Sequence, residues 1–213
     1  MGLFSFRRRA QRKEEPVAEG QPVYLLVGLG NPGREYRNTR HNAGFMVIDR
    51  LSEVLKIGIS RMQERALVGV GSDGERKIIL AKPQTYMNLS GTAISALMRF
   101  YKVPPANLLV IHDDIDLPLG TLRIRSSGGS GGQKGLASTI ERLGTEDICR
   151  MRVGIGRPPG QKMAADYVLH PFSRDEQELA SLVIDRAADA AVLFMRSGID
   201  AAMNRYNGAL PKD

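Results

Sequence analysis

The sequence predicts an α/β fold, a single-domain three-layer α/β/α sandwich around a mixed, mostly parallel twisted sheet. β-rich stretches alternate with stretches whose apolar residues recur at helical spacing, and this order favours parallel strand pairs. One Asp-Gly turn between two apolar runs adds an antiparallel hairpin. With 213 residues, 42% of them hydrophobic, the chain can bury one full core.

The N-terminal half predicts a β-loop-α unit, a hairpin and a second helix. "VYLLVGL", residues 23–29, is rich in β-formers and leads into turn-forming residues over 30–42. The first helix is indicated by apolar residues at helical spacing, namely Phe45, Ile48, Leu51 and Leu55. "ALVGVG" and "KIILAKP" flank Ser72-Asp73-Gly74 and predict the hairpin. The second helix ends before Pro104-Pro105, and its shared apolar face consists of Ile94, Leu97, Met98 and Tyr101.

The C-terminal half predicts three strands and two further helical stretches. "NLLVIHD" indicates a buried strand, "TLRIRSS" an alternating one and "MRVGIG" a third. Between the last two lies a short helix, stopped by Gly144, with the apolar residues Leu136, Ile140 and Leu143. Ser173 and Glu176 have capping-box spacing and open a long helix, after which a second short helix extends to Tyr206.

Composition and charge indicate an anionic partner. The chain has 30 Lys and Arg against 23 Asp and Glu, a net charge of +7, which suits nucleic acid or a membrane surface. Residues 1–22 predict a basic, disordered leader, 23–207 the folded domain and 208–213 a C-terminal tail. No run of eighteen apolar residues occurs, and Cys149 is the single cysteine. We therefore expect a cytoplasmic protein.

The segment Gly28–Gly33, "GLGNPG", matches the G-x-G-x-x-G spacing of dinucleotide-binding proteins. That fingerprint requires a helix that begins inside the glycine run and an acid about 20 residues on, after the next strand. Here helical spacing begins only near Asn42, and the candidate acids Asp49 and Glu53 lie on that helix. The pattern therefore does not favour a nicotinamide or flavin site.

The same loop favours a hydrolytic site instead. Asparagine can hold a carbonyl group or a water molecule, and His41 can accept a proton near neutral pH. "HDDIDLP" offers Asp113, Asp114 and Asp116 as acceptors that could orient this histidine. A metal site formed by His112 and these acids is the alternative, but consecutive strand residues point to opposite faces. His112 and His170 are expected to be core or surface histidines.

Five stretches in order together resemble the bacterial-type peptidyl-tRNA hydrolases: "VGLGNPGREYRNTRHNAG", "KPQTYMNLSG", "HDDIDLPLG", "GGSGGQKGL" and "RMRVGIGRP". The resemblance spans about residues 23–207. It implies an enzyme that cleaves the ester between a peptide and the 3′-terminal ribose of tRNA, which recycles tRNA for translation. It implies no metal and no organic cofactor.

The resemblance also implies roles for individual residues. His41 matches the catalytic histidine, and Asp113 matches the aspartate that orients it. Asn31 and Asn88 match the asparagines that hold the peptidyl main chain and the reacting carbonyl. The expected cleft and substrate contacts, including an apolar peptide groove, are Tyr36, Asn42, Tyr86 and Met87.

A basic surface for tRNA is expected on two strands. Arg123 and Arg125 alternate on one strand, and Arg150 and Arg152 repeat the pattern on another. Gln133 and Lys134 stand where the best-known relatives carry His-Asn, and both are expected to contact substrate. Lysine cannot accept a hydrogen bond, so Lys134 would contact a phosphate or ribose, or Gln133 would take over the role.

Two other functions are consistent with parts of the sequence. An RNA-binding protein on the same fold, like the organellar relatives that act in intron splicing, would use the basic leader and Lys134. An oxidoreductase would bind NADH. Because His41, Asp113, Asn31 and Asn88 occur together, we favour a monomeric hydrolase with peptidyl-tRNA as its partner and no membrane.

Overall fold

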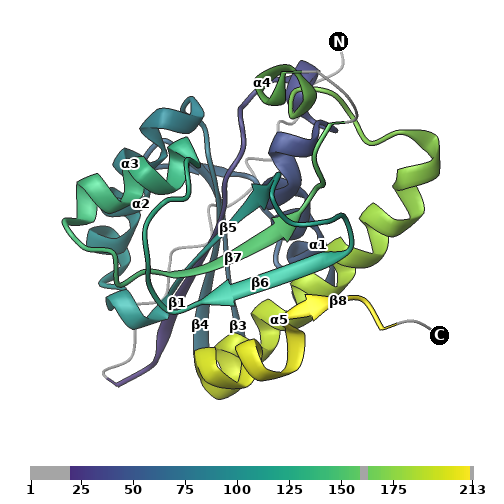
Figure 1. Cartoon of the computed structure of the whole chain (residues 1–213). Helices are drawn as coiled ribbons and strands as arrows, with labels where there is room; N and C mark the ends of the chain where they lie inside the picture. The colour runs from purple at the N-terminus through teal and green to yellow at the C-terminus, as the bar shows by residue number, and fades with distance from the viewer. Residues whose placement is uncertain (1–19, 159–162, 212–213) are drawn as a thin grey trace, which may run out of the picture.

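An eight-stranded sheet forms the middle layer of the computed structural model, which describes residues 20–158 and 163–211 (Figure 1). The strand order is β2-β3-β4-β1-β5-β7-β6-β8. All strands except β3 and β6 run in one direction, which confirms the mixed sheet. The strands are β1 (Val23–Gly28), β2 (Arg61–Gln63), β3 (Ala66–Asp73), β4 (Arg76–Pro83), β5 (Leu108–Asp114), β6 (Thr121–Arg125), β7 (Cys149–Gly154) and β8 (Gly208–Ala209).

Helices cover both faces of the sheet, as predicted (Figure 1). Helices α1 (Ala43–Leu55) and α5 (Arg174–Tyr206) pack on one face, and α2 (Ser90–Tyr101) and α3 (Lys134–Leu143) on the other. The short helix α4 (Ala164–Tyr167) lies near the carboxyl ends of the central strands. The 3₁₀ turns are η1 (Arg34–Tyr36), η2 (Arg40–Asn42), η3 (Met87–Leu89) and η4 (Pro105–Asn107).

Local sequence signals set most helix ends. Helices α1 and α2 end at Lys56 and Lys102, which adopt the left-handed conformation, and α2 therefore stops two residues before Pro104. Gly144 ends α3 in the same way. The capping box between Ser173 and Glu176 is present at the start of α5. A non-helical residue, Gly198, divides this helix, which accounts for the predicted second short helix.

Three short elements were not predicted from the sequence: β2, α4 and β8. Each is too short to show a periodic apolar pattern. Strand β8 lies within residues 208–213, the expected tail, and pairs with β6. The side chain of Asn207, just before β8, accepts a hydrogen bond from the N–H of Ile124 and donates one to its carbonyl. These bonds hold the start of β8 beside β6. The leader lies outside the described residues, except for residues 20–22.

The first glycines of "GLGNPG" allow close packing of α1 against the sheet. A Cβ on Gly28 would lie 2.1 Å from the carbonyl oxygen of Gly44, and one on Gly44 would lie 2.4 Å from that of Ile111. A Cβ on Gly30 would meet the ring of Phe45. These glycines therefore bring α1 onto the ends of β1 and β5, where a dinucleotide-binding loop would leave room for pyrophosphate.

Among the helices of the described part of the chain, none is long and apolar enough to cross a membrane.

Replacing Gly44 by alanine tests the close packing of α1. We expect Gly44→Ala to lower the free energy of unfolding by about 1–3 kcal/mol or more, because backbone atoms rather than flexible side chains would meet the new methyl group. Gly58→Ala is the control, since no atom lies within 4 Å of its Cβ position, and its effect should stay within about 0.5 kcal/mol. Urea denaturation of both variants measures the difference, and equal stabilities would contradict the packing argument.

Candidate active site

A cleft of about 770 Å³ opens at the carboxyl ends of β1, β4 and β5. It brings together residues that the sequence separates by more than a hundred positions. Its lining includes eight of the predicted site residues: Asn31, His41, Tyr86, Met87, Asn88, Asp113, Gln133 and Lys134. Tyr36 and Asn42 are not among the lining residues.

His41 and Asp113 form a hydrogen-bonded pair at the base of the cleft. The distance between His41 Nδ1 and Asp113 Oδ2 is 2.9 Å, and the Asp113 side chain is only 6% exposed. A carboxylate accepts hydrogen bonds, so this contact places a proton on Nδ1 and leaves Nε2 of the neutral ring as an acceptor. The His41 side chain is 19% exposed, so that the ring remains accessible from the cleft.

The backbone of His41 is held by a distant segment of the chain. The His41 N–H donates to the carbonyl of Val168 at 2.9 Å, and the Arg40 N–H donates to that of His170 at 3.1 Å. Thr39 forms a β-bridge with Pro171. The turn η2 is therefore fixed by the segment that follows α4, as well as by its own link to α1.

Asn31 and Asn42 fix the loop that follows β1. The Asn31 N–H donates to Asn42 Oδ1 at 2.8 Å, and Asn42 Nδ2 donates to the Asn31 carbonyl at 3.0 Å. Asn31 Oδ1 in turn accepts a hydrogen bond from the Met87 N–H at 3.1 Å. Asn42 is thus a buried support of the loop, while the Asn31 amide is oriented with its Nδ2 donor available to a ligand.

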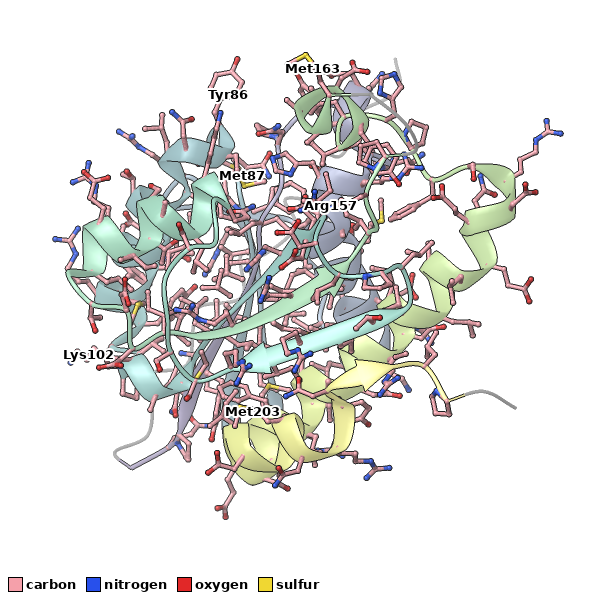
Figure 2. The ribbon with its side chains drawn as sticks, viewed as in Figure 1. Tyr86, Met87, Lys102, Arg157, Met163 and Met203 are labelled. Atoms are coloured by element: carbon pink, nitrogen blue, oxygen red, sulfur yellow. The ribbon has the colours of Figure 1, made fainter. Side chains whose placement is uncertain are left out.

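The segment after β4 supplies the other side of the cleft. Asn88 and Tyr86 are exposed, whereas Met87 is buried and lies below Tyr86 in the view of Figure 2. Tyr86 is 68% exposed and points outward at the mouth of the cleft (Figure 2). Polar and apolar side chains therefore meet at the same edge.

Gln133 lies behind Asp113 and caps α3. Its Nε2 is 3.4 Å from Asp113 Oδ1, while its Oε1 accepts a hydrogen bond from the Leu136 N–H at 2.8 Å. The two oxygens of Asp113 are thus divided between His41 and Gln133. Lys134 is exposed on the first turn of α3 and also lines the cleft.

The three acids of "HDDIDLP" diverge. Asp113 turns toward His41, whereas Asp114, on the opposite face of β5, forms an ion pair with Arg152, and Asp116 pairs with Arg157. Within the described residues, no group of three or more His, Cys, Asp or Glu is arranged to hold a metal ion. The divergence agrees with the strand-alternation argument against a metal site here.

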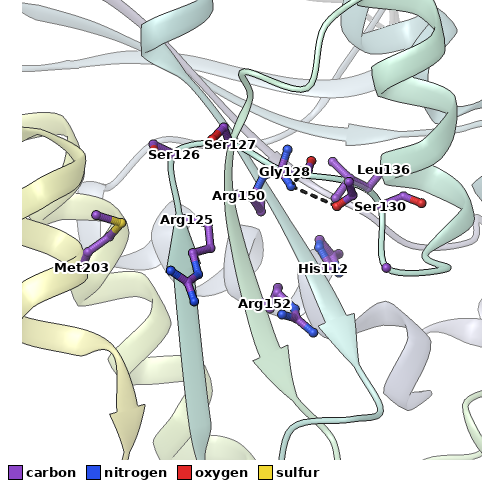
Figure 3. A pocket seen from close by; sticks show the side chains of 12 residues that line it. His112, Arg125, Ser126, Ser127, Gly128, Ser130, Leu136, Arg150, Arg152 and Met203 are labelled. Carbon is purple, nitrogen blue, oxygen red and sulfur yellow. Dashed lines mark hydrogen bonds between the residues drawn. The ribbon is translucent and has the colours of Figure 1, made fainter.

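A second pocket, of about 390 Å³, is basic and is drawn in Figure 3. Residues that line both pockets show that it adjoins the cleft. The two share His112, Ser130 and Gly131 as lining residues. Arg125 and Arg152 line the basic pocket beneath the glycine- and serine-rich loop 126–131. Arg123 lies beside Arg152 in the sheet register but not among the pocket residues.

Arg150 differs from the other arginines of the pocket. It is 3% exposed, and its guanidinium donates to the carbonyls of Ile148, Gly128, Gly129 and Glu146. The sequence-based expectation that Arg150 repeats the RNA-facing role of Arg152 is therefore wrong, because its donors already hold the glycine-rich loop against β7.

His112 is a core histidine, as expected from the sequence. It is 2% exposed, and its Nδ1 lies 2.7 Å from the carbonyl oxygen of Asp113. Burial lowers the pKa of its imidazole, so the ring is neutral. The exposed His170 contacts the carbonyl of Asp166 through its own Nδ1.

Sequence reasoning missed the wall of the cleft that α4 forms. This wall, residues 164–169, contributes apolar side chains opposite Tyr86 and Met87: Ala164, Ala165, Val168 and Leu169. These four residues have helical spacing, which is the signal in the sequence that could have predicted the wall. The segment is too short for that spacing to stand out.

The fold and this site define an α/β hydrolytic enzyme, with a histidine–carboxylate pair beside amide side chains in a partly apolar cleft. The family model of peptidyl-tRNA hydrolases matches residues 25–213. The peptidyl-tRNA hydrolase of Moorella thermoacetica is 51% identical over 186 residues, 87% of this chain and 98% of that protein. The crystal structure of the enzyme from Acinetobacter baumannii matches with a TM-score of 0.81 and 32% identity, and covers 89% of this chain and 98% of that one. The chain belongs to the peptidyl-tRNA hydrolase family.

The role of Arg150 can be separated from that of Arg125 by stability. We expect Arg150→Ala to lower the free energy of unfolding by about 3 kcal/mol, because it leaves buried carbonyls without donors. Arg125→Ala, at an exposed position, should change it by no more than about 0.5 kcal/mol. Denaturation curves provide the comparison, and a stable Arg150→Ala protein would show that loop 126–131 is held by other contacts.

Proposed function

We propose that this chain hydrolyses the ester between the peptide and the 3′-terminal ribose of peptidyl-tRNA, with His41 as general base. Membership of the peptidyl-tRNA hydrolase family supports the reaction. The observation that carries the assignment of residues is the 2.9 Å contact between His41 and Asp113 in a cleft that also holds Asn31 and Asn88.

In the proposed reaction, a water molecule donates a proton to His41 Nε2 as its oxygen attacks the ester carbonyl. Asp113 stabilises the imidazolium that results and keeps the ring in the required tautomer. The tetrahedral intermediate then expels the ribose 3′ oxygen, which takes the proton back from the imidazolium. The products are a peptide with a free carboxyl group and a tRNA with a free 3′ end.

Asn31 and Asn88 are proposed to bind the reacting end of the peptide. Because Asn31 Oδ1 accepts a hydrogen bond from Met87, its Nδ2 is the group oriented to donate to a substrate carbonyl. Asn88 lies on the same edge of the cleft and offers a second amide. Donors that are fixed before the reaction stabilise the developing oxyanion without further reorganisation.

Gln133 is proposed to support Asp113 rather than to contact substrate. Its amide is directed at the Asp113 oxygen that His41 does not use, and its carbonyl is committed to the cap of α3. Lys134, which is exposed at the cleft, is left as the substrate-contacting residue of this pair. An ammonium group there suits a phosphate of the 3′-terminal nucleotides.

The basic pocket is proposed to take the backbone of the tRNA acceptor end. Arg125 and Arg152 lie there beside a loop with many backbone N–H groups, and Arg123 extends the basic row along the sheet. The apolar wall over residues 164–169 and Met87 suit the peptide. Contacts to phosphate and sugar do not depend on sequence, as an enzyme that accepts many tRNAs requires.

Activity as a monomer is part of the same proposal. No cofactor takes part in the proposed reaction. Cytoplasmic location follows from the substrate, which translation produces, and is part of the same proposal.

Replacing His41 or an asparagine tests the catalytic proposal. We expect His41→Ala to lower the rate of release of tRNA from N-acetylated aminoacyl-tRNA by about 10²–10⁴. Asn88→Ala should lower it by about 10²–10³, because an oxyanion donor is lost. Asn204→Ala, at an exposed position on α5, is the control and should behave as wild type.

The substrate control is the unblocked aminoacyl-tRNA, which should not be turned over. If folded wild-type protein bound tRNA but released nothing from the blocked substrate, an RNA-binding role without hydrolysis would replace the proposal. NADH fluorescence in the presence of the protein checks the oxidoreductase alternative, for which binding is required.

Replacing Arg125 tests the basic pocket. We expect Arg125→Ala to weaken binding of different tRNAs by a similar factor and to reduce the slope of log affinity against log salt by about 1. The rate at saturating substrate should stay unchanged, because Arg125 lies outside the cleft with His41. Arg99→Ala, an exposed arginine on α2, is the matched control. An unchanged salt slope for Arg125→Ala would place the tRNA backbone elsewhere.

A further inference from the structure

We propose that Arg40 is a positioning residue. It fixes the base His41 and the apolar wall, residues 164–169, relative to each other. The inference rests on the proposed function of His41. It concerns a residue that does not line the cleft and that acts through its neighbours.

Arg40 is a buried cation with an unusual number of contacts. It is 5% exposed. Its Nη1 donates to the carbonyls of His170 at 3.2 Å and Pro171 at 2.7 Å, and its Nη2 forms an ion pair with Glu176 Oε2 at 2.5 Å. A buried charge is tolerated only when it is paired and hydrogen-bonded. Here both Nη atoms of the guanidinium meet these conditions, while the buried Nε has no hydrogen-bond partner among the described residues.

Two aromatic rings hold the same guanidinium. Its central carbon lies 4.1 Å from the ring centre of Tyr167 and 5.3 Å from that of Phe172. Tyr167 is the last residue of α4, so the wall is attached to Arg40 directly. A planar guanidinium stacks on aromatic rings while it donates hydrogen bonds in a fixed geometry, whereas a lysine ammonium has no plane that could stack.

Glu176 anchors this cluster to α5. Its Oε2 also accepts the Ser173 N–H at 2.8 Å as part of the capping box. Burial acts to raise the pKa of Glu176, but the hydrogen bonds from Ser173 and the charge of Arg40 outweigh it and hold the pKa below its ordinary value. The carboxylate therefore stays ionised and paired at neutral pH.

The cluster reaches His41 through the backbone. His170 and Pro171, whose carbonyls accept from the Arg40 side chain, belong to the segment whose carbonyls also accept from the Arg40 and His41 N–H groups. The same segment carries Val168 and Leu169, which line the cleft. A shift of this segment would therefore move the base and the peptide wall together.

Three variants separate positioning from simple stability. We expect Arg40→Lys to lower kcat by about 10–100-fold with little change in KM, since a displacement of about 1 Å can cost 10²-fold. Glu176→Gln retains a side chain that can close the capping box but loses the ion pair, and it should lower kcat by a smaller factor. The combined variant should lose less than the sum of the two single losses, because both side chains belong to one cluster of contacts.

NMR signals of the histidine side chains report on the position of His41 and are independent of a change in overall stability. The chain has only three histidines, so that their NMR resonances can be assigned by substitution. We expect the chemical shifts of the His41 imidazole to change in Arg40→Lys and Glu176→Gln, while those of His112 stay in place. Arg50→Lys is the matched control, because Arg50 also joins a helix to α5, through Asp185, but lies away from the cleft.

The outcomes distinguish a failure of the proposed function from a failure of the proposal for Arg40. If wild-type protein does not release tRNA from N-acetylated aminoacyl-tRNA, the proposed function fails. If wild type is active and both variants keep its kcat and its His41 spectrum while only their melting temperatures fall, Arg40 is a structural residue and the inference is overturned. Should Arg40→Lys not fold, Glu176→Gln alone decides between these results.

Discussion

The structure depends on one close contact, in which the N-terminal turn of α1 lies against the ends of β1 and β5 with glycine on both sides. Gly28 and Gly44 permit backbone atoms to approach where any Cβ would collide. This approach carries η2, at the start of α1, over the end of β5. His41 on η2 and Asp113 on β5 are thereby brought within hydrogen-bonding distance. The glycine pattern that resembles a nucleotide loop is, in this chain, the condition for a histidine–carboxylate pair.

Around this pair, hydrogen bonds to the surrounding protein fix the amide side chains through one or both of their polar ends. Asn31 uses its oxygen on Met87, Gln133 uses its oxygen on the start of α3, and Asn42 uses both ends on the backbone of the loop. The remaining donors are then directed before any substrate arrives. Such preorganisation is what electrostatic stabilisation of a developing charge requires. The different hydrogen bonds of these amide side chains also explain their different proposed roles. Asn31 keeps a donor for the substrate, whereas Asn42 supports the loop.

Much of the fold could be predicted because its signals are local. Helical spacing, the capping box of Ser173 and the turn glycines each act over a few residues. The site depended on the resemblance, since spacing alone left three aspartates as candidates to pair with His41. What the sequence could not indicate depends on distant chain segments. Arg150 and Arg152 alternate identically, and only the loop 126–131 folded over one of them makes it structural. The wall of α4 and the short strand β8 likewise owe their existence to partners far along the chain.

The hydrogen bonds between η2 and the segment after α4 affect when the site can form during translation. Arg40 and His170 are 130 positions apart, so their contact cannot form until most of the chain has been synthesised. Domains generally fold as units during translation, and the residues that fix His41 are among the later ones to appear. A partly synthesised chain therefore holds the histidine, the aspartate and both asparagines without the support that orders them. The contacts that fix His41 can therefore form only after residues 168–176 have been synthesised and have packed against η2.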